Sequence, residues 1–237
     1  MLTVQTWDQP THLAAPKPAP RQDVTGELEL KWVAFAGEAT LVRLSLRKRL
    51  LDIIGAAVLS IISLPIVVLL ALGSAVAFRA WPFFMQVREG QHGHPFRFVK
   101  IRSLSKKAPK YADREQLGDV QISRWGNFIR NRHIDELPQL FNVLAGSMSL
   151  VGPRPHAVAH NELYRRQING YMVRHKVRPG ITGWAQVHGL RGETDTVEKM
   201  EARVRYDLEY LSNWSVVLDV KILLKTLFVV LGQKNAY

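Results

Sequence analysis

Residues 49–79 read RLLDIIGAAVLSIISLPIVVLLALGSAVAFR, and this stretch decides the fold class of the chain. From Leu50 to Phe78 the only charged side chain is Asp52. The run is longer than the ~20 apolar residues that a helix needs to cross the hydrocarbon core of a bilayer. We therefore expect a helix embedded in a membrane, with more polar segments on both sides of it in the sequence.

Pro65 lies near the middle of this run and predicts a bend there. Proline removes one helical hydrogen bond and kinks or breaks a helix. The hydroxyl of Ser63 is close enough to bond a carbonyl that such a bend leaves free. A bent helix can enter the bilayer and return to the same face, whereas a Pro-kinked helix that spans the bilayer is the alternative.

Cations at both ends of the run favour the first of these topologies. They are Arg43, Arg47, Lys48 and Arg49 before it, and Arg79 and Arg88 after it. Lysine and arginine collect on the cytoplasmic side of membrane segments, so positive charge on both flanks favours two cytoplasmic ends. We expect the segments before and after the run to lie on this same face.

The segment before the run has two parts. Residues 1 to about 26 contain four prolines and few large apolar side chains, a composition that does not bury enough surface to offset the entropy of ordering. The apolar spacing from Glu27 to Leu46 fits either a strand or a short amphipathic helix. We expect residues 1–45 to be a Pro-rich, largely flexible N-terminal segment and residues 46–80 to be the membrane helix.

Residues 81–237 have the pattern of one small domain of the α+β class, mainly helical. Turn residues precede a segment from Phe96 to Ile101 that alternates like a strand. Helical periodicity follows in residues 124–130, 137–144, 161–173 and 196–211. Residues 214–231 mix apolar side chains with Lys221 and Lys225, which fits an amphipathic helix in the lipid interface as well as an ordinary core helix.

Two adjacent carboxylates, Asp135 and Glu136, are the main catalytic candidates, because they stand among cations. Their segment is Ile134-Asp135-Glu136-Leu137-Pro138-Gln139-Leu140, and Val151-Gly152-Pro153-Arg154-Pro155 follows eleven residues later. A carboxylate that attacks phosphorus needs a divalent cation on its neighbour and guanidinium groups on the phosphate oxygens. Nearby arginines are Arg124, Arg130, Arg132 and Arg154. In the alternative interpretation, Asp135 only caps a helix that runs to Gly146.

The chain carries a formal net charge of +12 and no cysteine. The charge indicates an anionic partner surface: a membrane, a nucleic acid or phosphorylated ligands. The lack of cysteine excludes disulfides and thiolate chemistry, so a bound metal would have oxygen ligands. A non-enzymatic basic module that binds lipid headgroups or nucleic acid is therefore the alternative to an enzyme.

Six motifs occur in a fixed order over about residues 46–231. They are Arg49-Leu50-Leu51-Asp52-Ile53; Phe84 with Gln86, Arg88, Gly90, Gly93, Pro95 and Phe96; Lys100-Ile101-Arg102-Ser103; Asp135-Glu136-Leu137-Pro138-Gln139-Leu140; Gly152-Pro153-Arg154-Pro155; and Arg178-Pro179-Gly180-Ile181-Thr182-Gly183-Trp184-Ala185-Gln186. This set resembles the bacterial sugar transferases that act on polyprenyl phosphate, the monotopic phosphoglycosyl transferases. Residues 152–157 and 189–196 are similar to undecaprenyl-phosphate glucose phosphotransferases that initiate exopolysaccharides.

The resemblance implies a re-entrant membrane helix hairpin and, at residues 81–237, a small cytoplasmic catalytic domain with interfacial amphipathic helices, at the bacterial inner membrane. It implies that a UDP-sugar gives its sugar phosphate to Asp135 with release of UMP, and that undecaprenyl phosphate then collects it. Glu136 matches the family's Mg²⁺ ligand, and Arg130 and Arg154 match phosphate-binding arginines.

Further candidates for substrate binding are Arg88, Lys100, Arg102, Arg124, Arg178 and Gly180. The segment from Arg178 to Trp184 also fits a plain Gly-Pro turn beside a core tryptophan. The expected donor is UDP-glucose, with UDP-galactose its nearest competitor and N-acetylated amino sugars as further alternatives. Inner membrane lipids are expected partners and nucleic acid is not, while the sequence leaves a homodimer open.

Overall fold

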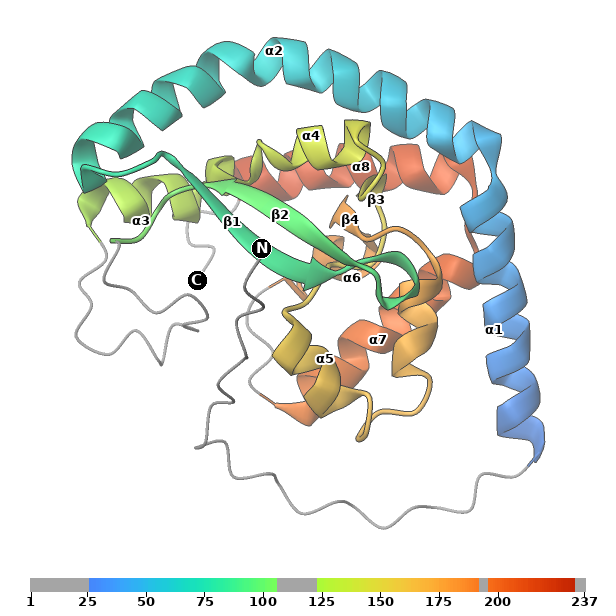
Figure 1. Cartoon of the computed structure of the whole chain (residues 1–237). Helices are drawn as coiled ribbons and strands as arrows, with labels where there is room; N and C mark the ends of the chain where they lie inside the picture. The colour runs from blue at the N-terminus through green and yellow to red at the C-terminus, as the bar shows by residue number, and fades with distance from the viewer. Residues whose placement is uncertain (1–25, 106–122, 192–195, 233–237) are drawn as a thin grey trace, which may run out of the picture.

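The computed structural model describes residues 26–105, 123–191 and 196–232. Figure 1 shows helices and short strands beneath one long arched helix. In chain order the elements are α1 (Gly26–Leu44), α2 (Leu46–Phe78), β1 (Phe83–Glu89), the 3-10 turn η1 (Gln91–Gly93), β2 (Pro95–Ile101), α3 (Arg124–Asn131), the 3-10 turn η3 (Ile134–Glu136), α4 (Gln139–Leu144), β3 (Ser149–Val151), α5 (Val158–Tyr164), the 3-10 helix η4 (Tyr171–Lys176), β4 (Gly180–Thr182), α6 (Trp184–Val187), α7 (Val197–Ser212) and α8 (Val216–Gly232). The expected class, α+β and mainly helical, is confirmed.

The arched helix α2 is continuous, so the expected hairpin of two helices joined at Pro65 is not observed. Pro65 lies inside the helix, and the bend is spread along the arch that Figure 1 shows. Val67 and Leu70 explain this, because both are buried in a small core beneath the arch and hold the second half of α2 against the domain. The Ser63 hydroxyl contacts Ser60 O at 3.5 Å, not the carbonyl that the proline leaves without a partner.

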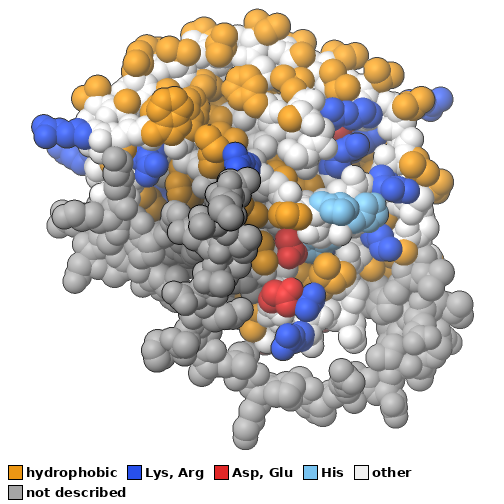
Figure 2. Space-filling view, viewed as in Figure 1, with side chains coloured by type: hydrophobic (Ala, Val, Ile, Leu, Met, Phe, Trp, Pro, Cys, Tyr) orange, Lys and Arg blue, Asp and Glu red, His pale blue; other side chains and the backbone are white. Residues whose placement is uncertain are grey.

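One face of α2 packs on the protein and the other is apolar and exposed. The buried residues repeat at helical spacing along its length: Lys48, Asp52, Ala56, Ser63, Val67, Leu70 and Ser74. Figure 2 shows hydrophobic side chains over the outer, upper surface of the arch. Among the described residues, α2 is the one helix that is long and apolar enough to cross a membrane, and 22% of its most apolar part is buried.

Both ends of α2 are attached to the same domain. At its start, Arg49 donates to the carbonyls of Val143 and Leu144 at 2.8 and 3.2 Å. Near its end, the indole of Trp125 donates to Ser74 Oγ at 2.9 Å. Both ends of α2 therefore contact one body.

The part of the N-terminal segment that the structure describes is a helix. Residues 26–44 form α1, which settles the open choice between strand and helix. Ala39 and Val42 are buried, and α1 packs against η4 and α7. This half of the segment that we expected to be flexible therefore belongs to the domain, and residues 1–25 lie outside the described residues.

The two sheets are small. β1 and β2 form an antiparallel hairpin in which Phe84 pairs with Lys100, and the expected strand at residues 96–101 is confirmed. β3 and β4 are parallel, with Ser149 opposite Gly180. Their close approach requires glycine, because a side chain at Gly180 would lie 2.1 Å from the backbone nitrogen of Gly152.

Three of the four predicted internal helices are confirmed as α3, α4 and α7, within a few residues. The helix expected over residues 161–173 is wrong in extent. Helix α5 ends at Tyr164, and Gly170, with a φ of 73°, redirects the chain into η4. A glycine in this left-handed conformation keeps a helix from running on to residue 173, although α5 itself ends six residues earlier.

Helix α8 combines both interpretations left open for residues 214–231. Asp219 and Ile222 on its inner face are fully buried. Val217, Leu227 and Phe228 on the other face are 77%, 58% and 76% exposed. The helix is therefore part of the core and also presents an apolar outer surface, close to that of α2, which it contacts.

Candidate active site

The two adjacent carboxylates lie in the short turn η3, ahead of α4. His133 precedes the turn with a left-handed φ of 54°, which reverses the chain after α3. Asp135 and Glu136 are both buried, at 5% exposure each. The N-cap of α4 is Pro138, so the interpretation of Asp135 as a cap of that helix is wrong.

Glu136 is held by two cations from other elements. Lys100 Nζ on β2 lies 2.7 Å from Glu136 Oε1. Arg154, after β3, places Nη2 2.7 Å from Oε1 and Nη1 3.2 Å from Oε2. Burial would raise the pKa of Glu136, but the charges and hydrogen bonds of Arg154 and Lys100 hold this pKa well below its ordinary value. Glu136 is therefore an ionised carboxylate at neutral pH.

Asp135 is buried beside this cluster, yet it makes no hydrogen bond or ion pair with any residue that the structure describes. Burial, and also the charge of Glu136, raises the pKa of Asp135 to about 6, while Lys100, Arg130 and Arg154 act to lower it. At neutral pH the group is a carboxylate whose oxygens are not engaged by donors. Such a group is a better nucleophile than one that accepts strong hydrogen bonds.

Lys100 sits at the centre of the charged cluster. Its ammonium group lies 5.2 Å from the ring centre of Phe98, and burial lowers its pKa although both carboxylates act to raise it. Lys100 was one of six weaker candidates in the sequence, and the structure brings it directly to Glu136.

The Gly152-Pro153-Arg154-Pro155 segment is fixed by its own backbone contacts. Arg174 Nη2 donates to the carbonyl of Arg154 at 2.8 Å, and Arg88 Nη1 donates to the carbonyl of Pro155 at 2.6 Å. Arg88 therefore holds the chain that presents Arg154. Gly180 contacts Gly152 from the other side, so it too supports this segment.

The remaining sequence candidates lie apart from Asp135. Arg102 donates to the carbonyl of Trp81 at 2.8 Å, beyond the end of α2. Arg178 donates to Gly146 O at 2.9 Å, and burial, then the charge of Arg49, lowers its pKa. Arg124 is exposed at the start of α3. Arg130, on the last turn of α3, is the exception, because its charge acts on Asp135.

A buried ion pair behind Arg154 was not predicted. Arg174 Nε lies 2.9 Å from Asp207 Oδ2 on α7, and the guanidinium also contacts His156 Nδ1 at 2.8 Å. Arg174 and Asp207 are 33 positions apart, and neither lies in a recognisable motif. No pattern in the sequence indicates that these two residues pair, because only the tertiary fold brings them together.

The side chains around Glu136 offer few oxygen ligands for Mg²⁺. Within the described residues no group of three or more histidine, cysteine, aspartate or glutamate side chains could hold a metal. Both oxygens of Glu136 already accept from Arg154 and Lys100. The residues fit Mg²⁺ only in its usual sharing mode, in which one or two carboxylates, water and substrate phosphates complete the shell.

Known proteins are similar to this sequence. The family described as bacterial sugar transferase matches residues 43–233. A UDP-glucose:undecaprenyl-phosphate glucose-1-phosphate transferase of Escherichia coli (strain K12) is 48% identical over 193 residues, 81% of this chain and 42% of that protein. The transferase of the same name from Caulobacter vibrioides is 44% identical over 217 residues, 91% of this chain and 81% of that protein.

A third relative carries a different sugar in its name. The UDP-N-acetylgalactosamine-undecaprenyl-phosphate N-acetylgalactosaminephosphotransferase of Aeromonas hydrophila is 40% identical over 190 residues, 78% of this chain and 43% of that protein. The chain thus spans less than half the length of the Escherichia and Aeromonas relatives.

Proposed function

The chain belongs to the bacterial sugar transferase family, and on this premise we propose that it transfers glucose 1-phosphate from UDP-glucose to undecaprenyl phosphate, with release of UMP. One observation carries the chemistry. Glu136 is fully paired with Lys100 and Arg154, while its neighbour Asp135 is buried, ionised at neutral pH and without a partner among the described residues. Adjacent carboxylates in such different settings suit different tasks.

In the proposed first step, a carboxylate oxygen of Asp135 attacks the phosphorus that bears the glucose. The bond from this phosphorus to the bridging oxygen breaks, and UMP leaves with that electron pair. In the second step, an oxygen of undecaprenyl phosphate attacks the same phosphorus and releases the Asp135 carboxylate. Because the transfer has two steps, the UDP-sugar and undecaprenyl phosphate must reach Asp135 at the same site, one after the other.

The cations around Asp135 supply what this attack needs. A carboxylate repels an anionic phosphate, so the rate depends on positive charge placed where negative charge develops. Arg154, Lys100 and Arg130 all act on Asp135 electrostatically. Arg154 is suited to phosphate oxygens because its planar guanidinium offers paired donors.

We propose Mg²⁺ as the cofactor, with Glu136 as the residue that would hold it. When bound, the ion neutralises charge on the donor diphosphate. Glu136 would then share its oxygens between the ion and the two cations, which frees donors of Arg154 and Lys100 for phosphate oxygens. The low pKa of Glu136 supports this role, because only the ionised form binds a divalent cation.

The exposed apolar surfaces of α2 and α8 support association with a membrane. The outer face of α2 and that of α8 are exposed and apolar, and both ends of α2 are attached to one domain. Figure 2 shows basic side chains and histidines gathered below the right-hand end of the arch. We propose that α2 is re-entrant, with the domain on the cytoplasmic face of the bacterial inner membrane.

The donor sugar rests on the names of the relatives. Glucose is named for the Escherichia and Caulobacter proteins, and N-acetylgalactosamine for the Aeromonas protein, which keeps it as the second candidate. A site that hydrogen-bonds one hydroxyl or acetamido group can discriminate strongly between such sugars.

Release of UMP by the protein in lipid nanodiscs tests the proposal. UDP-glucose, UDP-galactose, UDP-N-acetylglucosamine and UDP-N-acetylgalactosamine would each be supplied with and without undecaprenyl phosphate. We expect UDP-glucose to be used fastest, with repeated turnover only when the acceptor is present. Turnover of an N-acetylated sugar in preference to glucose would overturn the sugar assignment alone. No UMP from any donor, with lipid binding that weakens steeply in salt, would favour the basic binding module instead.

A further inference from the structure

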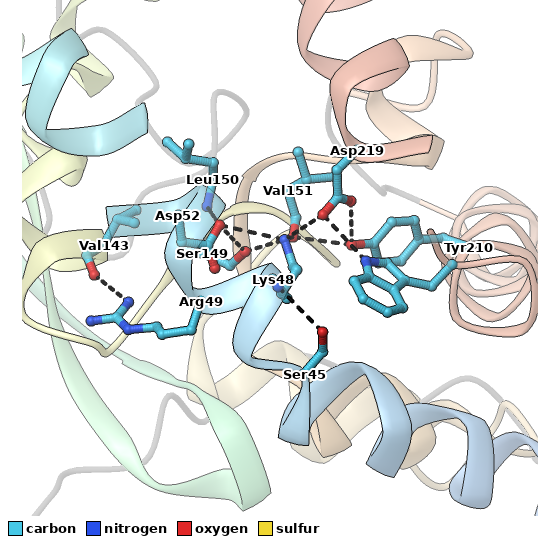
Figure 3. A network of polar contacts seen from close by, with 11 residues as sticks. Ser45, Lys48, Arg49, Asp52, Val143, Ser149, Leu150, Val151, Tyr210 and Asp219 are labelled. Carbon is cyan, nitrogen blue, oxygen red and sulfur yellow. Dashed lines mark hydrogen bonds and ion pairs between the residues drawn. The ribbon is translucent and has the colours of Figure 1, made fainter. Parts of the chain in front are cut away.

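Lys48, on the first turn of α2, lies at the centre of a buried polar cluster that joins three elements (Figure 3). Its ammonium group is 3.4 Å from Asp52 Oδ1 on α2, 3.0 Å from Asp219 Oδ2 on α8 and 2.9 Å from the carbonyl of Val151 on β3. A lysine has three N–H donors. In Lys48 each N–H has a different acceptor. The ammonium nitrogen therefore fixes the positions of α2, α8 and β3 relative to one another.

Both carboxylates are in turn fixed by other donors. Asp52 Oδ1 accepts from the backbone nitrogen of Leu150 at 2.9 Å and from Ser149 Oγ at 2.8 Å. Asp219 accepts from Tyr210 OH at 2.8 Å and from the Trp214 indole at 3.2 Å. Burial, and then the Asp219 charge, keep the pKa of Tyr210 well above its usual value, so the hydroxyl retains the proton that it donates.

The cluster carries more negative than positive charge. Asp52 and Asp219 are fully buried, Lys48 is nearly so, and together they have a formal charge of −1. The second oxygen of Asp52 has no hydrogen-bond partner among the described residues. A buried group of this kind is weak support for stability, because desolvation offsets much of the attraction. The role of this cluster is better understood as fixing the relative positions of α2, α8 and β3.

What the cluster fixes is the start of the segment that carries Arg154. The Val151 carbonyl bonded by Lys48 stands immediately before Gly152-Pro153-Arg154-Pro155. At the far end, Arg174 and Arg88 hold the carbonyls of Arg154 and Pro155. Between these points the two prolines restrict the backbone. A change in the position of Val151 therefore passes to Arg154 rather than being absorbed by a flexible chain.

We propose that Lys48 is a positioning residue for the phosphate-transfer reaction: through Val151 it sets Arg154 against Glu136. This inference rests on the function proposed above. Asp219 and the side-chain oxygen at position 52 belong to the same device, because both accept from the ammonium group. Since Lys48 stands at the start of the apolar helix α2 and Asp52 also bonds to β3, this cluster joins the packing of that helix to the geometry of the site.

Two variants test the proposal. Asp52→Asn keeps Lys48 and keeps an amide oxygen for Leu150. Lys48→Met combined with Asp52→Asn removes the bond to Val151 and leaves the cluster at its original formal charge of −1. We expect Asp52→Asn to retain kcat/KM for the UDP-sugar within about 3-fold. The double variant should lose roughly 10- to 100-fold, because a displacement near 1 Å has this effect on aligned groups.

Each variant is then combined with Arg154→Lys in a double-mutant cycle. If Lys48 acts through Arg154, its loss should change kcat/KM by less than about 2-fold once Arg154 is replaced. Losses that multiply would overturn the proposal, since a cluster that only stabilises the fold would act independently of Arg154. Should the Lys48 variant not accumulate in membranes, Ser149→Ala takes its place, with Ser74→Ala at the other end of α2 as the matched control.

Hydrogen–deuterium exchange supplies a readout that needs no substrate. The Gly152 amide, which donates to Thr182 O at 2.9 Å, should exchange faster in the double variant than in Asp52→Asn. Unchanged exchange would contradict the proposal even if the parent released no UMP from any donor. Failure of the proposed function and failure of the positioning role are thereby distinguished.

Discussion

The guanidinium of Arg154 meets the carboxylate of Glu136 at two points, with N–O distances of 2.7 and 3.2 Å. Glu136 is buried and Arg154 largely so, and Lys100 on β2 makes the third contact to this carboxylate. Glu136 is therefore neutralised by its partners, whereas Asp135, one residue earlier, is subject to the same cations without bonding to any of them.

Replacement of Asp135 should abolish turnover and the covalent intermediate together. We expect Asp135→Asn to lower UMP release by at least about 10³-fold, because an amide cannot act as the nucleophile. Intact-protein mass spectrometry after incubation with donor alone should show a sugar-phosphate adduct on the parent and none on the variant. Glu209→Gln, an exposed change on α7, should behave as the parent. An adduct that persists in Asp135→Asn would place the nucleophile elsewhere.

The same replacement should stabilise the fold, in a pH-dependent way. The pKa of Asp135 is about 6, above its ordinary value of 3.8. The folded state thus binds this proton more tightly than the unfolded state, and ionisation of Asp135 as the pH rises through 6 costs stability. At pH 8 we expect Asp135→Asn to be more stable than the parent by on the order of 2–3 kcal/mol.

By pH 4 most of this advantage should disappear, because Asp135 is then protonated in the folded state and about half protonated in the unfolded state. Thermal unfolding in detergent at pH 8 and at pH 4 measures the difference, with Glu209→Gln as the control. An equal effect at both pH values would show that the amide acts through packing, not through the removed charge.

The plot of kcat/KM against pH should rise on its acid side as Asp135 ionises. The midpoint of this rise, the acid limb, should move in opposite directions in Lys100→Met and Glu136→Gln. Activity requires the Asp135 carboxylate, so kcat/KM should rise with pH through about 6. Lys100→Met removes a positive charge that favours ionisation, and its limb should move to higher pH. Glu136→Gln removes a negative charge that opposes ionisation, and its limb should move to lower pH.

The position of the limb is the readout, since both variants also lower the rate. Limbs that move together, or that stay in place, would assign the titration to a group other than Asp135. A magnesium titration of Glu136→Gln adds a second test: an unchanged half-saturating concentration would remove Glu136 as the metal ligand.

Much of this site lies close together in the sequence, and that part was predictable. Asp135 and Glu136 are adjacent, and Arg154 is presented by flanking prolines whose effect on the backbone is local. Lys100 comes from β2 and reaches Glu136 only because β2 packs against η3. Its proximity to Glu136 depends on tertiary packing. The same holds for the Arg174–Asp207 pair and for the Lys48 cluster, in which charged residues are buried together against the usual tendency.

The errors in the predicted elements have local physical causes. Pro65 does not divide α2, because buried neighbours on its inner face support the helix beyond the bend. The helix expected over residues 161–173 stops early, and Asn169-Gly170 was a turn signal within its range. Arg102 and Arg178 share motifs with site residues, but their side chains bond to carbonyls at the two ends of α2.

The last prediction concerns the side of the membrane on which the two ends of α2 lie. The chain has no cysteine, so single cysteines can be introduced cleanly. Ala34 on α1 and Glu209 on α7 are exposed positions before and after α2. Because both ends of α2 bind one domain, we expect neither Ala34→Cys nor Glu209→Cys to react with a membrane-impermeant thiol reagent added to intact cells with a permeable outer membrane. Both should react once the inner membrane is opened. Reaction of Ala34→Cys alone in intact cells would mean that α2 crosses the bilayer, and the re-entrant topology would then be wrong.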